Sequence, residues 1–366
     1  MSVNKHSNFS PIIRPALLAV AALAFATTGS ALADDYISGE PAAGRFPLVD
    51  QQAAADVFVD GDDWKVARIA AGDLVLDVER VTGRRPELKD AAADLSGHAV
   101  LVGTIGRSPV IDGLIEDGHL EVSDVKGEWE SFVIATIADP LPGVKQGLVI
   151  VGSDRRGTAY GVYELSKRIG VSPWFWWADV TPQRRTALHV SPERLRVGPP
   201  AVKYRGIFIN DEMWGIRPWA HGTLAPDEGK GLGPTTYAKI FELLLRLRAN
   251  YIWPAMHLHT IPFNFYEQNR VVADDYAIVM GSSHIEPMLR NNMRGAEWDQ
   301  EVGGEWNYLV NRDAIYKYWE RRVEANGRSE TVYTIGMRGK DDEAMKGGTS
   351  KEDTIALLER SFRDQR

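Results

Sequence analysis

The sequence contains no cysteine. Disulfide bonds and thiolate metal sites are therefore excluded. Basic residues are the minority charge, because 42 lysines and arginines stand against 50 aspartates and glutamates, for a formal net charge of −8. Phosphate binding needs concentrated positive charge, so no nucleic acid partner is expected. The length of 366 residues and the apolar fraction of 44% indicate at least two domains with ample cores.

Long apolar runs are missing except near the N-terminus. Residues 16–27 form an apolar run of about a dozen residues, too short for a comfortable membrane span. Basic Lys5 and Arg14 precede it, and Ala-Leu-Ala at 31–33 is a small-x-small cleavage site. The pattern predicts a secretory signal peptide over residues 1–33 and a secreted or periplasmic protein without a membrane partner after cleavage. The alternative interpretation is an uncleaved anchor helix.

Several catalytic and cofactor motifs are also absent. Gly-Ser-Asp-Arg-Arg-Gly at 152–157 lacks the G-x-G-x-x-G and Walker patterns, and indicates a strand-to-helix turn capped by Ser153 or Asp154. No G-x-S-x-G motif supports an esterase or protease. His284 and Glu286 lack the H-E-x-x-H order of a zinc site. We therefore predict no metal and no cofactor.

Residues 34–198 alternate between strand and helix patterns. Strands are predicted at 57–59, 100–103, 132–137 and 147–152, with helices over 63–82 and 157–169. This alternation is typical of a small α/β domain. Four consecutive aromatic residues at 174–177 either pack a seam between domains, which we favour, or stack on sugar rings. The Val-Gly-Pro-Pro segment at 197–200 is a stiff linker.

From residue 201 onward, apolar runs repeatedly end in polar clusters. Four such strand-plus-loop units lie at 206–212, 250–257, 276–286 and 331–343, and helical patterns at 237–248 and 308–326 separate some of them. Helices between apolar strands favour parallel pairing. A (β/α)₈ barrel carries its chemistry on the loops after its strands and needs eight strands. We therefore predict an α/β protein in which residues 201–366 form the first half of a truncated (β/α)₈ barrel.

The polar clusters contain residues suited to hydrolysis of a glycosidic bond. Carboxylates can act as acid and base on such a bond, an arginine can bind a substrate carboxylate, and a tryptophan can stack on a sugar. Taken singly, each residue is more often a helix cap or a surface charge, but recurrence after four strands favours a site. The candidates are Asp211 and Glu212, Trp253 and His257, His284 and Glu286, and Arg338 and Asp342.

Four segments carry a resemblance to a known family. YRGIFINDE at 204–212, NYIWPAM at 250–256, IVMGSSH-x-EPM at 278–288 and GMRG at 336–339 resemble signature blocks of glycoside hydrolase family 115. Its members are xylan α-1,2-glucuronidases, which remove glucuronic acid or its 4-O-methyl ether with inversion. The resemblance covers roughly 36–366, the N-terminal portion of such an enzyme. It implies a small α/β domain followed by a catalytic (β/α)₈ barrel.

The resemblance gives the candidate residues expected roles. The expected catalytic residues are Asp211, Glu286 and Asp342, with the assignment of acid and base left open. The expected substrate-binding residues are Trp253, His284, Arg338, Glu212 and His257. The expected partner is a xylan-type polysaccharide or a uronic-acid-bearing oligosaccharide. The alternative is a non-catalytic carbohydrate-binding protein derived from such an enzyme. The sequence does not indicate an oligomeric state.

Overall fold

The structure is a computed structural model, which describes residues 36–366 apart from 52, 212–213, 230, 258–260, 293–296 and 341–342. The predicted signal peptide and the candidates Glu212 and Asp342 lie outside the described residues. Asp35–Arg366 form one unit, so the domain boundary expected near residues 198–201 stays a prediction.

A six-stranded sheet forms the centre of the first region, with strand order β4-β3-β5-β7-β6-β9. β4, β3, β5 and β7 run parallel, whereas β6 pairs antiparallel with β7 and β9. Every strand predicted in this region is present. The bounds are β3 (Asp56–Val59), β4 (Leu88–Lys89), β5 (His98–Thr104), β6 (Phe132–Leu141), β7 (Val144–Gly152) and β9 (Leu195–Val197).

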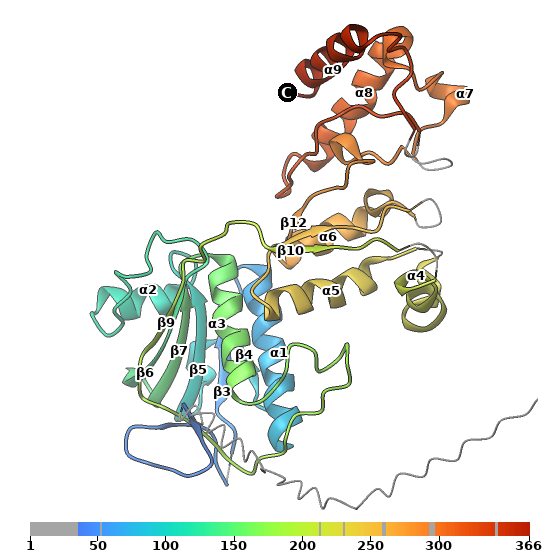
Figure 1. Ribbon diagram of the computed structural model, residues 1–366. Helices are drawn as coiled ribbons and strands as arrows, with labels where there is room; N and C mark the ends of the chain where they lie inside the picture. The colour runs from blue at the N-terminus through green and yellow to red at the C-terminus, as the bar shows by residue number, and fades with distance from the viewer. Residues whose placement is uncertain are drawn as a thin grey trace, which may run out of the picture. The chain divides into compact units, whose positions relative to one another are not determined.

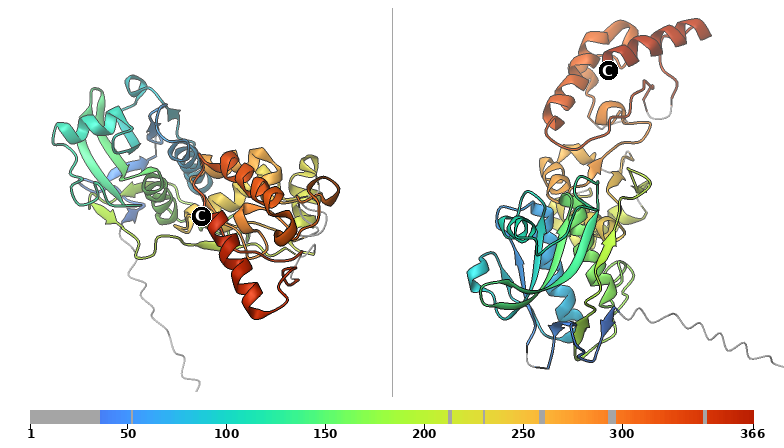
Figure 2. Two further views of the ribbon diagram at one scale, coloured as in Figure 1. Left: turned by 90° about the horizontal axis from the view of Figure 1, so that it is seen from above. Right: turned by 90° about the vertical axis from the view of Figure 1, so that its left-hand side faces the viewer.

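Helices cover both faces of this sheet (Figure 1). Side chains alternate between faces along a strand, so Val100 and Val102 of β5 pack with α1 (Lys65–Thr82) and α3 (Arg155–Arg168). Leu101 points to the other face and packs with α2 (Pro109–Glu116). The further views in Figure 2 agree with this layering. A separate antiparallel sheet has the order β1-β8-β2, from β1 (Ile37–Ser38), β2 (Phe46–Val49) and β8 (Leu188–Val190).

The turn at residues 152–157 is a helix start, as its sequence indicates. Asp154 is the N-cap of α3, and its Oδ1 accepts the backbone N–H groups of Arg156 and Gly157 at 3.0 and 2.8 Å. A Cβ at Gly157 would lie 2.2 Å from the Ser131 carbonyl oxygen, so only glycine fits this close approach of helix and sheet.

The second region contains a small parallel sheet. β10 (Gly206–Phe208), β11 (Tyr251–Trp253) and β12 (Val279–Met280) pair in that order, as the apolar runs predict. α5 (Pro234–Arg246) follows β10, and α6 (Glu267–Asp275) follows β11. Ile252 packs with residues of α5 and α6 in one core cluster. That cluster continues into α1 and α3, so one apolar core connects the two regions.

The fourth predicted strand is the main correction. Within the described residues, the segment expected as a strand at 331–336 makes only a single parallel bridge, between Thr331 and Met280. Beyond it, Thr334 leaves the ladder, because its hydroxyl donates to the Ser282 carbonyl at 2.6 Å and its own carbonyl accepts from Met288 N–H. The described residues thus show a mixed α/β fold with three paired parallel strands and no closed barrel.

Further helices complete the second region. α4 (Ile216–Trp219) and α7 (Gln300–Gly303) are short, whereas α8 (Tyr308–Asn326) and α9 (Lys351–Gln365) are long and pack around a cluster that includes Trp319 and Leu357. Ser350 caps α9 by accepting the Asp353 N–H at 3.1 Å. Among the described residues, no helix has the length and apolar character needed to cross a membrane.

Two members of the aromatic run at 174–177, Phe175 and Trp177, contact both regions, whereas Trp174 is exposed. Phe175 lies under the guanidinium groups of Arg80 and Arg246, at 4.4 and 4.9 Å. Trp177 donates to the Lys239 carbonyl at 3.3 Å and lies 5.8 Å from the Trp219 ring. These contacts agree with the seam interpretation of the run.

Candidate active site

The loops that follow β10, β11 and β12 leave the same edge of the small sheet. Phe208 pairs in register with Trp253, and Ile252 pairs with Met280. Because the strands are parallel, the segments after their last residues emerge together. This edge corresponds to the face on which barrel enzymes carry their chemistry.

Asp211, three residues after β10, is buried and has 4% of its surface exposed. Its Oδ2 accepts the backbone N–H of Arg217 at 3.0 Å, which holds the carboxylate against the start of α4. A Cβ at Gly215 would lie 3.2 Å from the other carboxylate oxygen, Oδ1. Asp211 also lines a hollow of about 180 Å³, together with Trp214 and others. The carboxylate is therefore fixed in place beside open space.

Glu286 follows β12 and is also buried, with 4% exposed. Burial raises its pKa to about 8; the Asn291 hydrogen bond opposes the rise, and the nearby charge of Glu297 adds to it. Asn291 donates to Glu286 Oε1 at 2.9 Å and to the Met256 carbonyl at 2.8 Å. The Glu286 carboxyl group is therefore largely protonated at neutral pH, as a general acid requires.

Tyr237 connects the two acidic residues. It lies on α5 with none of its surface exposed, and burial raises the pKa of its hydroxyl. The charges of Glu286 and Asp211 each raise it further, so both carboxyl groups lie within electrostatic range of this hydroxyl. The nearby Ala255 backbone lowers this pKa. The geometry of the described residues nevertheless gives the Tyr237 hydroxyl no hydrogen bond. Residues that follow two different strands thus converge on one tyrosine.

The end of the small sheet carries a row of aromatic rings. Trp253 contacts Phe208 edge-on at 5.5 Å, and its indole N–H donates to the Tyr251 hydroxyl at 2.7 Å. A Cβ at Gly281 would lie 1.9 Å from the Tyr251 hydroxyl oxygen and 2.8 Å from the Trp253 ring. Glycine at this position therefore gives the two rings the space to lie side by side.

The remaining candidates lie on the loops after β11 and β12 and in the segment beyond residue 336. His284 is exposed on the loop after β12, and His257 is half-buried after β11. Arg338 is half-buried, and its carbonyl accepts the Trp306 indole N–H at 2.9 Å. The described residues contain no cluster of three or more acidic or histidine side chains suited to a metal ion.

Sequence reasoning did not identify Tyr237 or Asn291 as site residues. Tyr237 falls in an ordinary apolar helix pattern, and only the folding of α5 against the sheet brings it near both acids. Asn291 lies five residues after Glu286, and no known motif spacing marks it.

Comparisons with known proteins find similar sequences and structures. Residues 197–366 match the family model described as Glycosyl hydrolase family 115. A solved structure described as a family GH115 4-O-methyl-α-glucuronidase with specificity for decorated arabinogalactans is 39% identical, with a TM-score of 0.76. The match covers 88% of this chain and 40% of that chain, so this chain spans well under half of its relative.

Other solved structures are much less similar. A mutant Streptomyces plicatus β-hexosaminidase is 10% identical with a TM-score of 0.39, over 66% of this chain and 43% of that chain. This likeness is too low to carry a conclusion. Among curated proteins, none matches the sequence.

The model match and the structural relative place this chain in a family of glycoside hydrolases. Through residues 197–366, the chain belongs to glycosyl hydrolase family 115. The resemblance inferred from the four sequence segments is thereby confirmed.

Proposed function

We propose that this protein removes glucuronic acid, or its 4-O-methyl ether, from branches of glucuronoxylan by inverting hydrolysis. The observation that carries the proposal is the pair of buried carboxyl groups, Asp211 and Glu286, that both act on Tyr237. Membership of family 115 and the glucuronidase relative support the same class of substrate.

The two carboxyl groups suit different roles because their surroundings differ. Glu286 has a pKa raised to about 8 by burial, so it can donate a proton to the glycosidic oxygen as the bond breaks. Asp211, held by the Arg217 N–H, can accept a proton from water as that water attacks the anomeric carbon. Inversion requires roughly 6.5–9.5 Å between such carboxyl groups. Asp342 is the third candidate and lies outside the described residues.

Substrate contacts are proposed for the surrounding residues. Arg338 offers a charge-assisted pair to the uronate carboxylate, because a guanidinium binds carboxylates bidentately. Trp253, whose ring contacts Phe208 edge-on, offers a ring face for stacking on a sugar. His284 and His257 offer hydrogen bonds to sugar hydroxyl groups. Glu212 belongs to the same set and lies outside the described residues.

The relative described as specific for decorated arabinogalactans raises a second substrate. Uronic acid branches on arabinogalactan present the same terminal group on a different backbone. The deciding experiment incubates the protein with glucuronoxylan and with glucuronic-acid-decorated arabinogalactan, and measures released uronic acid. NMR of the first-formed anomer reports the stereochemistry. Release from neither polymer, or a product with retained configuration, contradicts the proposal.

We also infer that β10, β11 and β12 are the first strands of a (β/α)₈ barrel over 201–366, preceded by an α/β domain over 34–198. The parallel pairing and the alternating helices support this. We further propose that residues 1–33 direct export. N-terminal sequencing of the protein recovered from the periplasm or medium tests export, with residue 34 as the expected first residue and Met1 as the contradicting one.

A further inference from the structure

A second hollow lies at the carboxyl ends of the large sheet's strands, and residues of the second region, including Asp274 and Arg328, complete its lining. Its volume is about 650 Å³, and its lining includes Trp64 after β3, Gly106 and Arg107 after β5, and Ser153 after β7. This volume falls within the range of about 300–1,000 Å³ that is typical of small-molecule sites.

The topology of the sheet makes this a favoured place for a ligand. The chain leaves β3 through α1 toward β4 on one side, and it leaves β5 through α2 on the opposite face. Neighbouring parallel strands whose connections diverge leave a crevice outside their carboxyl ends, where ligands of open α/β sheets bind. Trp64, which follows β3, and Arg107, which follows β5, both line this crevice.

The charges around the hollow do not cancel locally. Four arginines line it, and two of them are neutralised: Arg155 pairs with Asp274 and Glu330, and Arg156 pairs with Glu330 and Glu130. The other two, Arg107 and Arg328, are exposed and have no carboxylate or hydrogen-bond partner in the described part of the chain. Arg107 lies over the Trp64 ring at 4.1 Å, which orders its guanidinium group.

The anion that fits is a carboxylate rather than a phosphate. Phosphate sites usually exploit free backbone N–H groups at a helix N-terminus. Here the Asp154 side chain occupies the Arg156 and Gly157 N–H groups of α3 and places a negative charge beside them. Recognition is left to the guanidinium groups, which bind carboxylates and phosphates alike. The preference for a carboxylate therefore rests on the occupied helix N-terminus.

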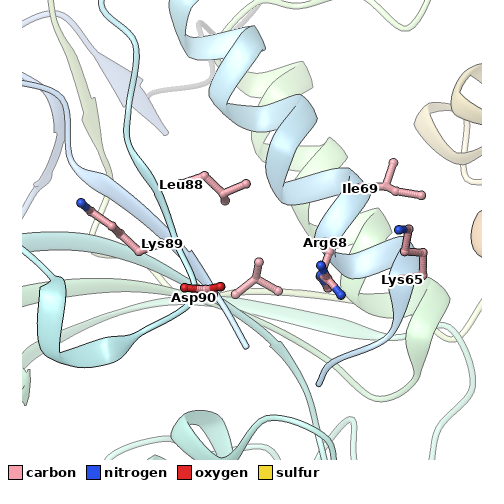
Figure 3. A pocket seen from close by; sticks show the side chains of 7 residues that line it. Lys65, Arg68, Ile69, Leu88, Lys89 and Asp90 are labelled. Carbon is pink, nitrogen blue, oxygen red and sulfur yellow. The ribbon is translucent and has the colours of Figure 1, made fainter. Parts of the chain in front are cut away.

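A neighbouring hollow provides the contrast. It has a volume of about 340 Å³. Its lining includes Lys65 and Arg68 of α1 and Lys89, the last residue of β4 (Figure 3). Two of these cations are engaged, because Arg68 donates to the Gly61 carbonyl at 3.1 Å and Lys89 pairs with Glu87. Arg68 therefore serves as a matched control for an arginine that already has a partner.

We propose that the Arg107–Arg328 hollow is a second saccharide site, which binds the carboxylate of a uronic acid away from the catalytic residues. The saccharide part of this proposal rests on the proposed function. Such a site would hold an acidic side branch of the polymer while the catalytic residues act on another branch.

The test uses the indole ¹⁵N NMR signal of Trp64 in the purified chain, assigned with Trp64→Phe. Sodium glucuronate is titrated in, with glucose and inorganic phosphate as comparison probes. Glucuronate is expected to shift the Trp64 signal, and glucose is not. The double variant Arg107→Gln/Arg328→Gln is expected to weaken glucuronate binding about tenfold or more, since it removes both charge-assisted contacts. Arg68→Gln is expected to leave it unchanged.

The result is independent of catalysis, because Glu286→Gln is expected to retain the Trp64 shift. A chain that hydrolyses glucuronoxylan but shows no Trp64 shift overturns this inference alone. A Trp64 shift in a chain without hydrolysis supports the site and contradicts the proposed function. Equal affinity for phosphate and glucuronate, or unchanged binding in the double variant, also overturns the inference. Thermal melts of each variant confirm that the fold is intact.

Discussion

The sheets of the first and second regions differ in strand length and in how far helices cover them. In the first, strands β5, β6 and β7 have 7, 10 and 9 residues, and helices cover both faces of the sheet. In the second, β10, β11 and β12 have 3, 3 and 2 residues. Phe208 remains 41% exposed there. The long ladders supply a framework, whereas the short strands serve to present loops. Functional residues commonly lie on loops held by a rigid scaffold.

Buried ion pairs fasten the second region to the first. Glu130, with 2% of its surface exposed, accepts Arg156 Nε at 2.7 Å within its own region. From the second region it accepts Arg205 at 2.6 Å and the Asn250 side chain at 2.6 Å. Because both Arg205 and Asn250 adjoin the short strands, this carboxylate fixes the start of the small sheet. Placement of the site therefore depends on specific polar contacts rather than on strand length.

The largest expected effect is on catalysis in the second region. Glu286→Gln removes the proposed proton donor but keeps the size and shape of the side chain. The kcat on glucuronoxylan is therefore expected to fall by about 10²–10⁴-fold. Glu301→Gln, an exposed glutamate on α7, is the control and is expected to have no effect. Steady-state release of uronic acid measures both. Near-normal turnover in Glu286→Gln would show that this carboxyl group is not the acid.

The next largest effect tests the connection between the regions. Arg246→Ala leaves the fully buried Asp77 and the buried Glu242 without their shared partner, so it is expected to cost about 3–5 kcal/mol of stability. Arg85→Ala, which breaks the exposed pair with Glu79, is expected to cost about 0–1 kcal/mol. Denaturant unfolding monitored by circular dichroism compares them. Equal losses in the two variants would contradict the importance of the buried pair.

A smaller effect is expected within the first region. Gly157→Ala forces a Cβ to within 2.2 Å of the Ser131 carbonyl oxygen, and relieving this overlap is expected to cost about 1–3 kcal/mol. Gly113→Ala in α2 meets no atom within 4 Å and replaces glycine with a better helix former, so it is expected to be neutral or stabilising by up to about 1 kcal/mol. Thermal melts measure both changes, and a stabilised Gly157→Ala would refute the close approach.

The stability of the second region is expected to depend on pH through Glu286. Burial raises the pKa of Glu286 from 4.5 to about 8, so between these pH values the folded chain holds a proton that the unfolded chain has lost. Stability contributed by this group is therefore present below pH 4.5 and is lost as pH rises toward 8. Glu286→Gln is expected to flatten the fall of Tm over this range by a few degrees. Identical pH profiles for the variant and the parent would show that Glu286 is ionised when folded.

The smallest expected effect concerns Tyr237. Its buried hydroxyl lies near two carboxyl groups without a hydrogen bond in the described structure, so Tyr237→Phe is expected to change stability by less than about 0.5 kcal/mol. It is expected to shift the upper limb of the pH–kcat profile, because the hydroxyl lies within electrostatic range of both Asp211 and Glu286. Tyr163→Phe breaks a 2.7 Å hydrogen bond to Asp73 and is expected to cost about 1 kcal/mol with an unchanged profile. An unchanged pH–kcat profile in both variants would show that Tyr237 has no role in the site.

Local sequence patterns were sufficient for most elements. Apolar runs predicted the parallel strands ending at Phe208 and Trp253, and the apolar periodicity at 308–326 predicted α8 with the same bounds. The pattern at 331–336 was misread as a full strand, because its apolar residues have the right type but the segment turns away after Thr331. Strand propensity reports how a segment can pair, and the available partner determines how far it does pair.

Which acidic residues follow which strands could be predicted from the sequence, because strand ends and polar loops are local features. The sequence also carried the family, since the four signature segments are contiguous stretches of residues. Tertiary structure alone decided that Asp211 and Glu286 both lie within range of Tyr237, and that Glu286 is buried deeply enough to stay protonated. Burial and electrostatic range depend on distances between residues far apart in the chain, and no local pattern specifies those distances.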